Sequence, residues 1–160
     1  MPPLSSLDVF HCETGAAELG WGGHVKPKII MADGVFDLLH YGHLLHLQAA
    51  KAMGDVLWVS VTDDLNVRKG VGHPVYRQEH RAALIKELRC VDHVITTSDL
   101  REGLEFVKPD ILVKGQDYKH GLDEAHKTYC RNMGIQIRFT DTPKFSALDM
   151  IREHQRTTGG

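Results

Sequence analysis

The sequence predicts an α/β fold, a doubly wound parallel sheet of five strands with helices on both faces. Two observations carry this prediction. Five short apolar runs, typical of strands buried on both faces, alternate with segments of helical periodicity. The chain has 160 residues, 42% of them hydrophobic, which suits one domain with a single core. Alternating strands and helices with right-handed crossovers give a parallel, Rossmann-like sheet.

The strands are predicted from length and residue type. They are expected at 28–32, 55–62, 91–97, 110–113 and 135–139. Each run is short and bounded by turn or helix signals, and β-branched residues such as those in Val56-Leu57-Trp58-Val59 favour a pleated, buried surface. The fourth strand ends at Lys114 and Gly115.

The helices are predicted from periodicity and from residues that suit helix ends. They are expected at 44–53, 77–89, 99–106, 122–132 and 146–154. Gly54 and Gly134 follow the first and fourth helices, where glycine favours termination. Asp99 and Ser146 are N-caps for the third and fifth. The second helix is predicted from apolar residues at helical spacing. The segment 68–76 before this helix holds two glycines and a proline, which predicts a loop.

Composition limits the function classes. Residues 28–160 are expected to form the domain, and residues 1–27 an N-terminal extension or linker. A formal net charge of −2 gives no electrostatic case for binding nucleic acid or an anionic membrane. The three cysteines are odd in number and widely spaced, which favours a reducing compartment. No signal peptide or membrane-spanning run is apparent, so we expect a cytoplasmic protein.

The most informative segment is Gly-Val-Phe-Asp-Leu-Leu-His-Tyr-Gly-His, residues 34–43. It joins the first strand to the first helix, so His40 and His43 lie at the start of that helix. Residues three apart share a helix face, and the two imidazoles therefore point together beside a helix N-terminus that favours anions. Gly42 between them lets a ligand approach the backbone. The segment predicts a phosphate site.

A zinc site is the alternative for this segment, because His46 continues the spacing of the two histidines. No cysteine or carboxylate cluster completes a coordination shell in the local sequence, so zinc ranks well below phosphate. Of the eleven histidines, only His40, His43 and His73 fall where chemistry is expected.

The pattern G-x-F-D-x-x-H-x-G-H after a strand resembles the signature of the cytidylyltransferase-like nucleotidyltransferases. This resemblance implies transfer of a nucleoside monophosphate from ATP or CTP onto a sugar phosphate or polyol phosphate, with release of pyrophosphate. It also implies Mg²⁺, bound mainly through the nucleotide phosphates and not at a metal site of the protein's own. A homodimer is common in such families and is the partner state that the resemblance suggests.

The resemblance also assigns roles within the signature. His40 and His43 donate hydrogen bonds to phosphate oxygens, and Lys69, with Arg68 as its rival, closes over the leaving pyrophosphate. The turn residues line the nucleotide site, and they are Gly34, Val35, Phe36 and Asp37. For Asp37 two readings stay open, holding the metal or fixing the turn.

Further motifs follow in the family's order. The Glu-x-Arg helix start at Glu79 implies that Arg81 lies near substrate phosphates. Lys-Gly-x-Asp-Tyr at the end of the fourth strand places Lys114, Gly115, Asp117 and Tyr118 at the nucleotide. This motif resembles the adenylyltransferase of ADP-heptose synthases more than the glycerol-3-phosphate cytidylyltransferases, so we slightly favour the former.

The last helix departs from the family. A Ser-Thr-Thr is usual at its start, whereas this chain has Ser146 followed by Ala147. Ser146 is kept as an N-cap and phosphate ligand, and Lys144 just before it supplies charge in place of the lost hydroxyl. The loss at position 147 favours the alternative function, a catalytically silent nucleotide-binding module.

Overall fold

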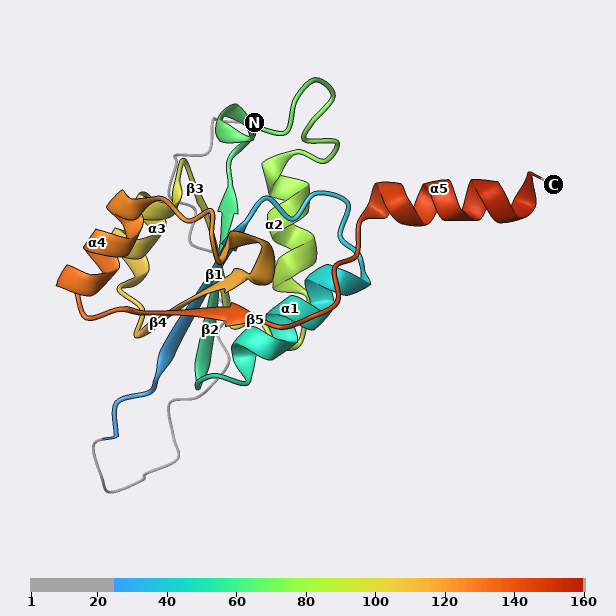
Figure 1. Ribbon diagram of the computed structural model, residues 1–160. Helices are drawn as coiled ribbons and strands as arrows, with labels where there is room; N and C mark the ends of the chain where they lie inside the picture. Colours follow the sequence, from blue (N-terminus) through green and yellow to red (C-terminus); the bar gives the residue numbers. More distant parts are fainter. Residues whose placement is uncertain (1–24, 160) are drawn as a thin grey trace.

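Five parallel strands form a sheet in the order β3-β2-β1-β4-β5 (Figure 1). The strands are β1 (Ile29–Gly34), β2 (Val56–Thr62), β3 (His93–Thr97), β4 (Ile111–Gly115) and β5 (Gln136–Thr140). Every neighbouring pair is parallel. This computed structural model describes residues 25–159. Nearly all of the extension expected at 1–27 therefore lies outside the described residues.

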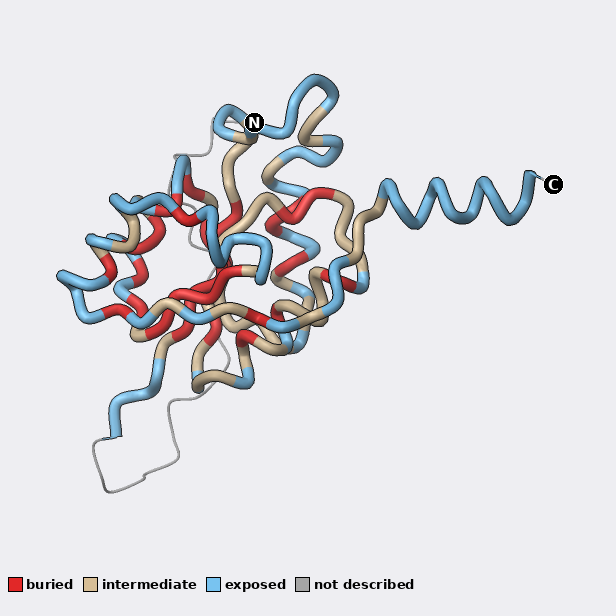
Figure 2. Tube along the Cα trace, in the orientation of Figure 1, coloured by how far each residue is buried: buried red, intermediate tan, exposed pale blue. Residues whose placement is uncertain are grey.

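Helices cover both faces of the sheet. They are α1 (Tyr41–Lys51), α2 (Gln78–Lys86), α3 (Leu100–Val107), α4 (Glu124–Asn132) and α5 (Ala147–Thr158). One core cluster joins the sheet to α1 and α2, and a second joins it to α3 and α4. The buried residues of both clusters lie along the strands and the inner sides of these four helices (Figure 2). The predicted α/β class, five-stranded parallel sheet and two helical layers are confirmed.

The central strand β1 shows why consecutive residues must be apolar. Ile30 and Ala32 belong to the cluster that includes Leu47 of α1, whereas Met31 belongs to the cluster that includes Leu104 of α3. Successive side chains of a strand point to opposite faces, and both faces of this strand are covered. All five residues are completely buried.

Element boundaries differ from the predictions at a few ends. The first helix begins at Tyr41 rather than Leu44, because His40 serves as its N-cap. The second helix ends at Lys86 rather than Arg89, and the fifth continues to Thr158. The two predicted side-chain caps, Asp99 and Ser146, are confirmed by hydrogen bonds from the backbone N–H groups three residues on.

The strand order places a crevice between β1 and β4. The chain moves outward from β1 through β2 to β3 and then crosses to β4 on the other side, so the order reverses between these neighbours. Ligands of open parallel sheets bind beyond the carboxyl ends of the strands at such a reversal. The helix α5 has no buried residue and extends away from the sheet (Figure 1). Among the described residues, no helix has the length and apolar character needed to cross a membrane.

Gly54, which follows α1, packs where no side chain fits. A Cβ there would lie 2.6 Å from Ile30 Cδ1 and 2.9 Å from the backbone oxygen of Lys28. We expect Gly54→Ala to lower the free energy of unfolding by about 1–3 kcal/mol, because backbone and core must shift. Urea unfolding followed by circular dichroism measures the change. Gly121→Ala is the matched control, since a Cβ at that glycine meets nothing within 4 Å, and equal stability of the two variants would contradict the prediction.

Candidate active site

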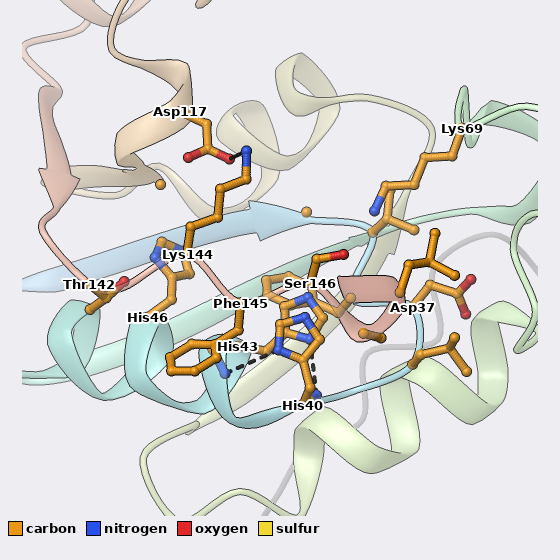
Figure 3. Close-up of a pocket in the computed structure, with 18 of the residues that line it drawn as sticks. Asp37, His40, His43, His46, Lys69, Asp117, Thr142, Lys144, Phe145 and Ser146 are labelled. Carbon is orange, nitrogen blue, oxygen red and sulfur yellow. Dashed lines mark hydrogen bonds and ion pairs between the residues drawn. The ribbon is translucent and has the colours of Figure 1, made fainter. Parts of the chain in front are cut away.

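A cavity of about 520 Å³ opens at the carboxyl ends of β1 and β4 (Figure 3). Four segments surround it: the signature turn with the start of α1, the loop after β2, the turn after β4, and residues 142–148. The sequence-predicted residues among its lining are Gly34, Val35, Phe36, Asp37, His40, Gly42, His43, Lys69, Gly115, Asp117, Tyr118, Lys144 and Ser146. Segments more than 100 residues apart in the chain thus meet at the predicted position.

The two signature histidines cap α1 and stack on each other. His40 Nδ1 accepts the backbone N–H of Gly42 at 3.1 Å, and His43 Nδ1 accepts the backbone N–H of His40 at 3.3 Å. The ring centroids are 3.8 Å apart. A nitrogen that accepts a hydrogen bond carries no proton, so each neutral ring holds its proton on Nε2. Each histidine is thereby fixed in one tautomer, with Nε2–H available as a donor to a ligand.

The surroundings keep both rings uncharged near neutrality. Burial, followed by the charges of His40 and Lys69, lowers the pKa of His43 to about 4. Burial and the nearby Lys69 also lower the pKa of His40. His46, one turn further along α1, has its pKa lowered to about 4 by burial and by Lys114. The free site therefore presents neutral imidazole donors.

These lowered pKa values predict an acid-sensitive fold. Between pH 6.5 and about 4, His43 and His46 bind protons in the unfolded chain but stay neutral in the native state. The free energy of unfolding therefore falls as the pH falls through this window. From pH 7 to pH 5 each residue contributes a loss of about 1–2 kcal/mol. Urea unfolding at both pH values should show a smaller loss for His46→Gln than for the wild type. An equal loss in both would contradict the prediction, and His80→Gln on the exposed side of α2 is the control.

Asp37 fastens the loop after β2 to the signature turn. Its Oδ2 accepts the backbone N–H of Val75 at 2.8 Å, and its Oδ1 accepts that of Tyr76 at 3.0 Å. Burial alone would raise the pKa of Asp37, but these N–H groups and His73 outweigh it and hold the pKa below its usual value. Of the two readings left open by the sequence, the geometry matches fixing the turn, because both carboxylate oxygens hold backbone groups.

The signature turn has an uncommon backbone. Phe36 and Leu38, which flank Asp37, have φ values of 51° and 50°, in the left-handed region that non-glycine residues seldom occupy. Such conformations cost free energy and persist where surrounding contacts enforce them, often at functional sites. Here the contacts of Asp37 and of the buried Phe36 ring supply that enforcement.

Two lysines face each other across the cavity. Lys69 comes from the loop after β2, and Lys144, paired with Asp117 at 3.2 Å, comes from the segment before α5. Figure 3 shows them on opposite sides of the stacked imidazoles. Positive charge therefore flanks the two neutral donors and the N-terminus of α1, an arrangement that suits a polyphosphate.

Two residues expected at the phosphates are placed elsewhere. Arg81 is fully buried beneath the turn, where it donates to the backbone oxygens of Val35 and Tyr76 and pairs with Asp64 at 2.8 Å. These three contacts hold the guanidinium beneath the turn, and Arg81 does not line the cavity. In this position Arg81 holds the turn, and its expected place near the substrate phosphates stays a prediction.

Lys114 is the second of these residues. It is buried and paired with Asp33 at 2.6 Å, below the ring of Tyr118, and it too is absent from the cavity lining. The buried pair satisfies its charge inside the protein. Lys114 thus lies beneath the cavity and outside its lining, and its contact with the nucleotide stays a prediction.

Several lining residues were not predicted as site residues. His46 and Asp33 line the cavity, and His46 Nδ1 lies 2.7 Å from Thr140 Oγ1 at the end of β5. Phe145 packs against the helix start, since a Cβ on Gly42 would lie 2.8 Å from its own Cβ. The spacing of the histidines in the sequence already drew attention to His46. The contact of Phe145 with Gly42 joins residues about 100 positions apart, so no local sequence pattern predicts it.

Among residues 25–159, no cluster of three or more His, Cys, Asp or Glu side chains is arranged to hold a metal ion. The Nδ1 atoms of His40, His43 and His46 each have a protein partner already. The cavity thus offers phosphate-binding groups and few carboxylate ligands.

The sheet order and the site together define a class. A five-stranded parallel sheet whose order reverses at a phosphate-type site is the arrangement of Rossmann-like nucleotide-binding domains. The profile of one such family, described as cytidylyltransferase-like, matches residues 31–156. The chain belongs to the cytidylyltransferase-like family, and the family expected from the sequence is confirmed.

Curated relatives agree with this placement. The bifunctional protein HldE of Desulfatibacillum aliphaticivorans is 47% identical over 136 residues, which are 82% of this chain and 28% of that protein. HldE of Nitratiruptor sp. is 46% identical over 134 residues, 81% of this chain and 28% of the relative. The chain thus spans little more than a quarter of the length of these relatives.

Solved structures show the same fold. The lipopolysaccharide core biosynthesis protein of Thermoplasma volcanium is 35% identical, with a TM-score of 0.62, and the match covers 76% of this chain and 100% of that one. Pantothenate synthetase of Thermus thermophilus shares the fold at a TM-score of 0.54 but only 13% identity, over 84% of this chain and 71% of the other.

Proposed function

We propose that this domain is a nucleotidyltransferase of the ADP-heptose synthase type, transferring a nucleoside monophosphate from ATP to a sugar phosphate. The observation that carries the proposal is the pair of neutral, tautomer-fixed imidazoles at the α1 N-terminus, flanked by Lys69 and Lys144. The Lys-Gly-x-Asp-Tyr motif at residues 114–118 resembles the adenylyltransferase of ADP-heptose synthases, and the relatives named bifunctional protein HldE match most of the chain. Together they favour ATP and a heptose phosphate over CTP and glycerol 3-phosphate.

The proposed reaction is an in-line displacement. An oxygen of the acceptor phosphate attacks the α-phosphorus of ATP, the bond from the α-phosphorus to the bridging oxygen breaks, and pyrophosphate leaves with the electron pair. His40 and His43 donate Nε2–H to phosphate oxygens as charge builds, and Lys69 balances the leaving pyrophosphate. No nucleophilic side chain is required.

Mg²⁺ belongs to the proposal as a cofactor that arrives with the nucleotide. Mg²⁺ retains several waters and commonly binds through substrate phosphates plus one or two carboxylates, which matches a cavity with Asp33 and Asp117 on its walls. When bound, it would neutralise phosphate charge. The cytoplasmic location and the homodimer expected from the sequence stay predictions.

Pyrophosphate release tests the proposal. ATP and CTP are each paired with heptose 1-phosphate and with glycerol 3-phosphate in the presence of Mg²⁺. Turnover restricted to ATP with the heptose phosphate is the expected result, and turnover restricted to CTP with glycerol phosphate would reassign base and acceptor. Nucleotide binding without pyrophosphate in any pairing would favour the silent module, and Ala147→Thr would then be the first variant to assay.

Lys144 is expected to bind the nucleotide. Because it sits at the cavity mouth beside the N-cap of α5, Lys144→Ala should raise the KM for ATP by about five- to tenfold with little change in kcat. Steady-state kinetics at saturating acceptor give both constants. Lys127→Ala on α4, whose lysine pairs with Glu124 away from the cavity, is the control, and an unchanged KM for Lys144→Ala would refute this role.

A further inference from the structure

His73 is an imidazole of the cavity that the proposed reaction does not yet use. It lies on the loop after β2, four residues beyond Lys69, and it lines the same cavity as His40 and His43. Its side chain is 30% exposed, whereas the carboxylate of Asp37 beside it is only 5% exposed. The partly buried imidazole of His73 therefore lies on the cavity wall beside the buried carboxylate of Asp37.

The contacts of His73 differ in kind from those of the two signature histidines. His73 Nδ1 lies 3.5 Å from Asp37 Oδ2, so this nitrogen faces a carboxylate oxygen and is a donor. In His40 and His43 the same nitrogen accepts a backbone N–H, so protonating it would break the cap of α1. Of these three histidines, only His73 has an acceptor facing its Nδ1, and Nε2 is then the nitrogen left for a ligand.

Charged groups from two segments lie near His73. Asp37 faces it from the signature turn, and Lys69 lies on the same loop as His73. The rings of His40 and His43 line the same cavity and are neutral near pH 7. A bound phosphate would add negative charge on the cavity side of the His73 ring. A negative charge at that distance favours the protonated, imidazolium form of the ring.

We propose that His73 binds a substrate phosphate as an imidazolium, with Nδ1–H held by Asp37 and Nε2–H donated to a phosphate oxygen. The proton comes from solvent as the ligand binds, and it returns to solvent when the product leaves. The inference rests on the proposed function for the presence of a phosphorylated ligand. The triphosphate and the acceptor phosphate share this chemistry, and the experiment separates them.

Calorimetry tests the proposal without requiring turnover. MgATP, MgCTP, heptose 1-phosphate and glycerol 3-phosphate are each titrated into the full chain at pH 7.5, in two buffers with different enthalpies of ionisation, which reports proton uptake. We expect the wild type to take up protons with one ligand class, and His73→Ala to lose that uptake and bind about tenfold more weakly or worse. The ligand class affected identifies which phosphate His73 contacts.

Matched variants separate a phosphate contact from a structural role. His73→Arg carries a permanent charge, so it should bind within a few-fold of the wild type without proton uptake. His80→Ala, on the exposed side of α2, should match the wild type in both measures. Unchanged affinity and proton uptake in His73→Ala would overturn the inference, as would a wild type that binds none of these ligands.

Failure of the role proposed for His73 can be distinguished from failure of the proposed nucleotidyl transfer. If the wild type releases pyrophosphate but His73→Ala behaves as the wild type in calorimetry, only the role of His73 falls. If proton uptake depends on His73 while no pairing gives pyrophosphate, the phosphate contact stands and nucleotidyl transfer falls.

Discussion

His40→Asn and His43→Gln should each lower kcat by about 10²–10³-fold while leaving the fold intact. The loss follows because each variant removes an Nε2–H donor from the place where phosphate charge builds, and a single such donor is typically worth this much. Asparagine is a strong N-cap, and glutamine at the third helical position completes a capping box. The two substitutions therefore preserve the hydrogen bonds that the imidazoles make to the start of α1.

Because the two variants preserve the N-terminal caps of α1, a fall in kcat would report a loss of catalysis and not a loss of stability. The melting temperature should stay within a few degrees of the wild type, whereas alanine at either position should also cost about 1 kcal/mol of stability. Pyrophosphate release with saturating substrates gives kcat, and circular dichroism gives the melting temperature. Near-normal kcat in both cap-preserving variants would remove the imidazoles from the mechanism.

Asp37→Asn should be the other severe substitution, acting through the loop after β2. The amide keeps the shape of the carboxylate but turns one acceptor into a donor, which then faces the N–H of Val75 or Tyr76. A buried donor left without a partner costs about 1–3 kcal/mol. Because the same loop carries Lys69 into the cavity, we also expect kcat/KM to fall by about 10²-fold.

The control for this substitution is an aspartate at the start of the loop after β2. Asp63 caps the short turn after β2 and is not part of the cavity lining, and asparagine is an equally good cap, so Asp63→Asn should keep both stability and activity. Urea unfolding and steady-state kinetics report the two effects. Wild-type kinetics in Asp37→Asn would show that the loop keeps its place without the carboxylate.

The fold could be predicted because local patterns determine most of it. The apolar run at residues 30–32 is buried on both faces of its parallel strand, and the alternation of strands with amphipathic segments leaves few topologies. The position of the site followed from the same reasoning, since the signature turn must leave the carboxyl end of the central strand. His40 and His43 needed only helical spacing to be placed together.

The remainder depends on contacts between distant segments. A basic residue in the right motif can face the cavity, as Lys69 does, or end in a buried pair, as Arg81 and Lys114 do. The partners that decide this, Asp64 and Asp33, carry no local sign of it. The fastening of the loop to Asp37 likewise joins residues 38 and 39 positions apart.

Transfer of the adenylyl group of ATP, which contains the α-phosphorus, is the central claim. Label transfer from ATP carrying ³²P at the α-phosphorus tests this claim most directly. With heptose 1-phosphate and Mg²⁺, the label should move into a phosphatase-resistant nucleotide sugar in an amount equal to the pyrophosphate released. Label that stays in ATP although the nucleotide is bound, or that appears in ADP, would contradict nucleotidyl transfer by this site.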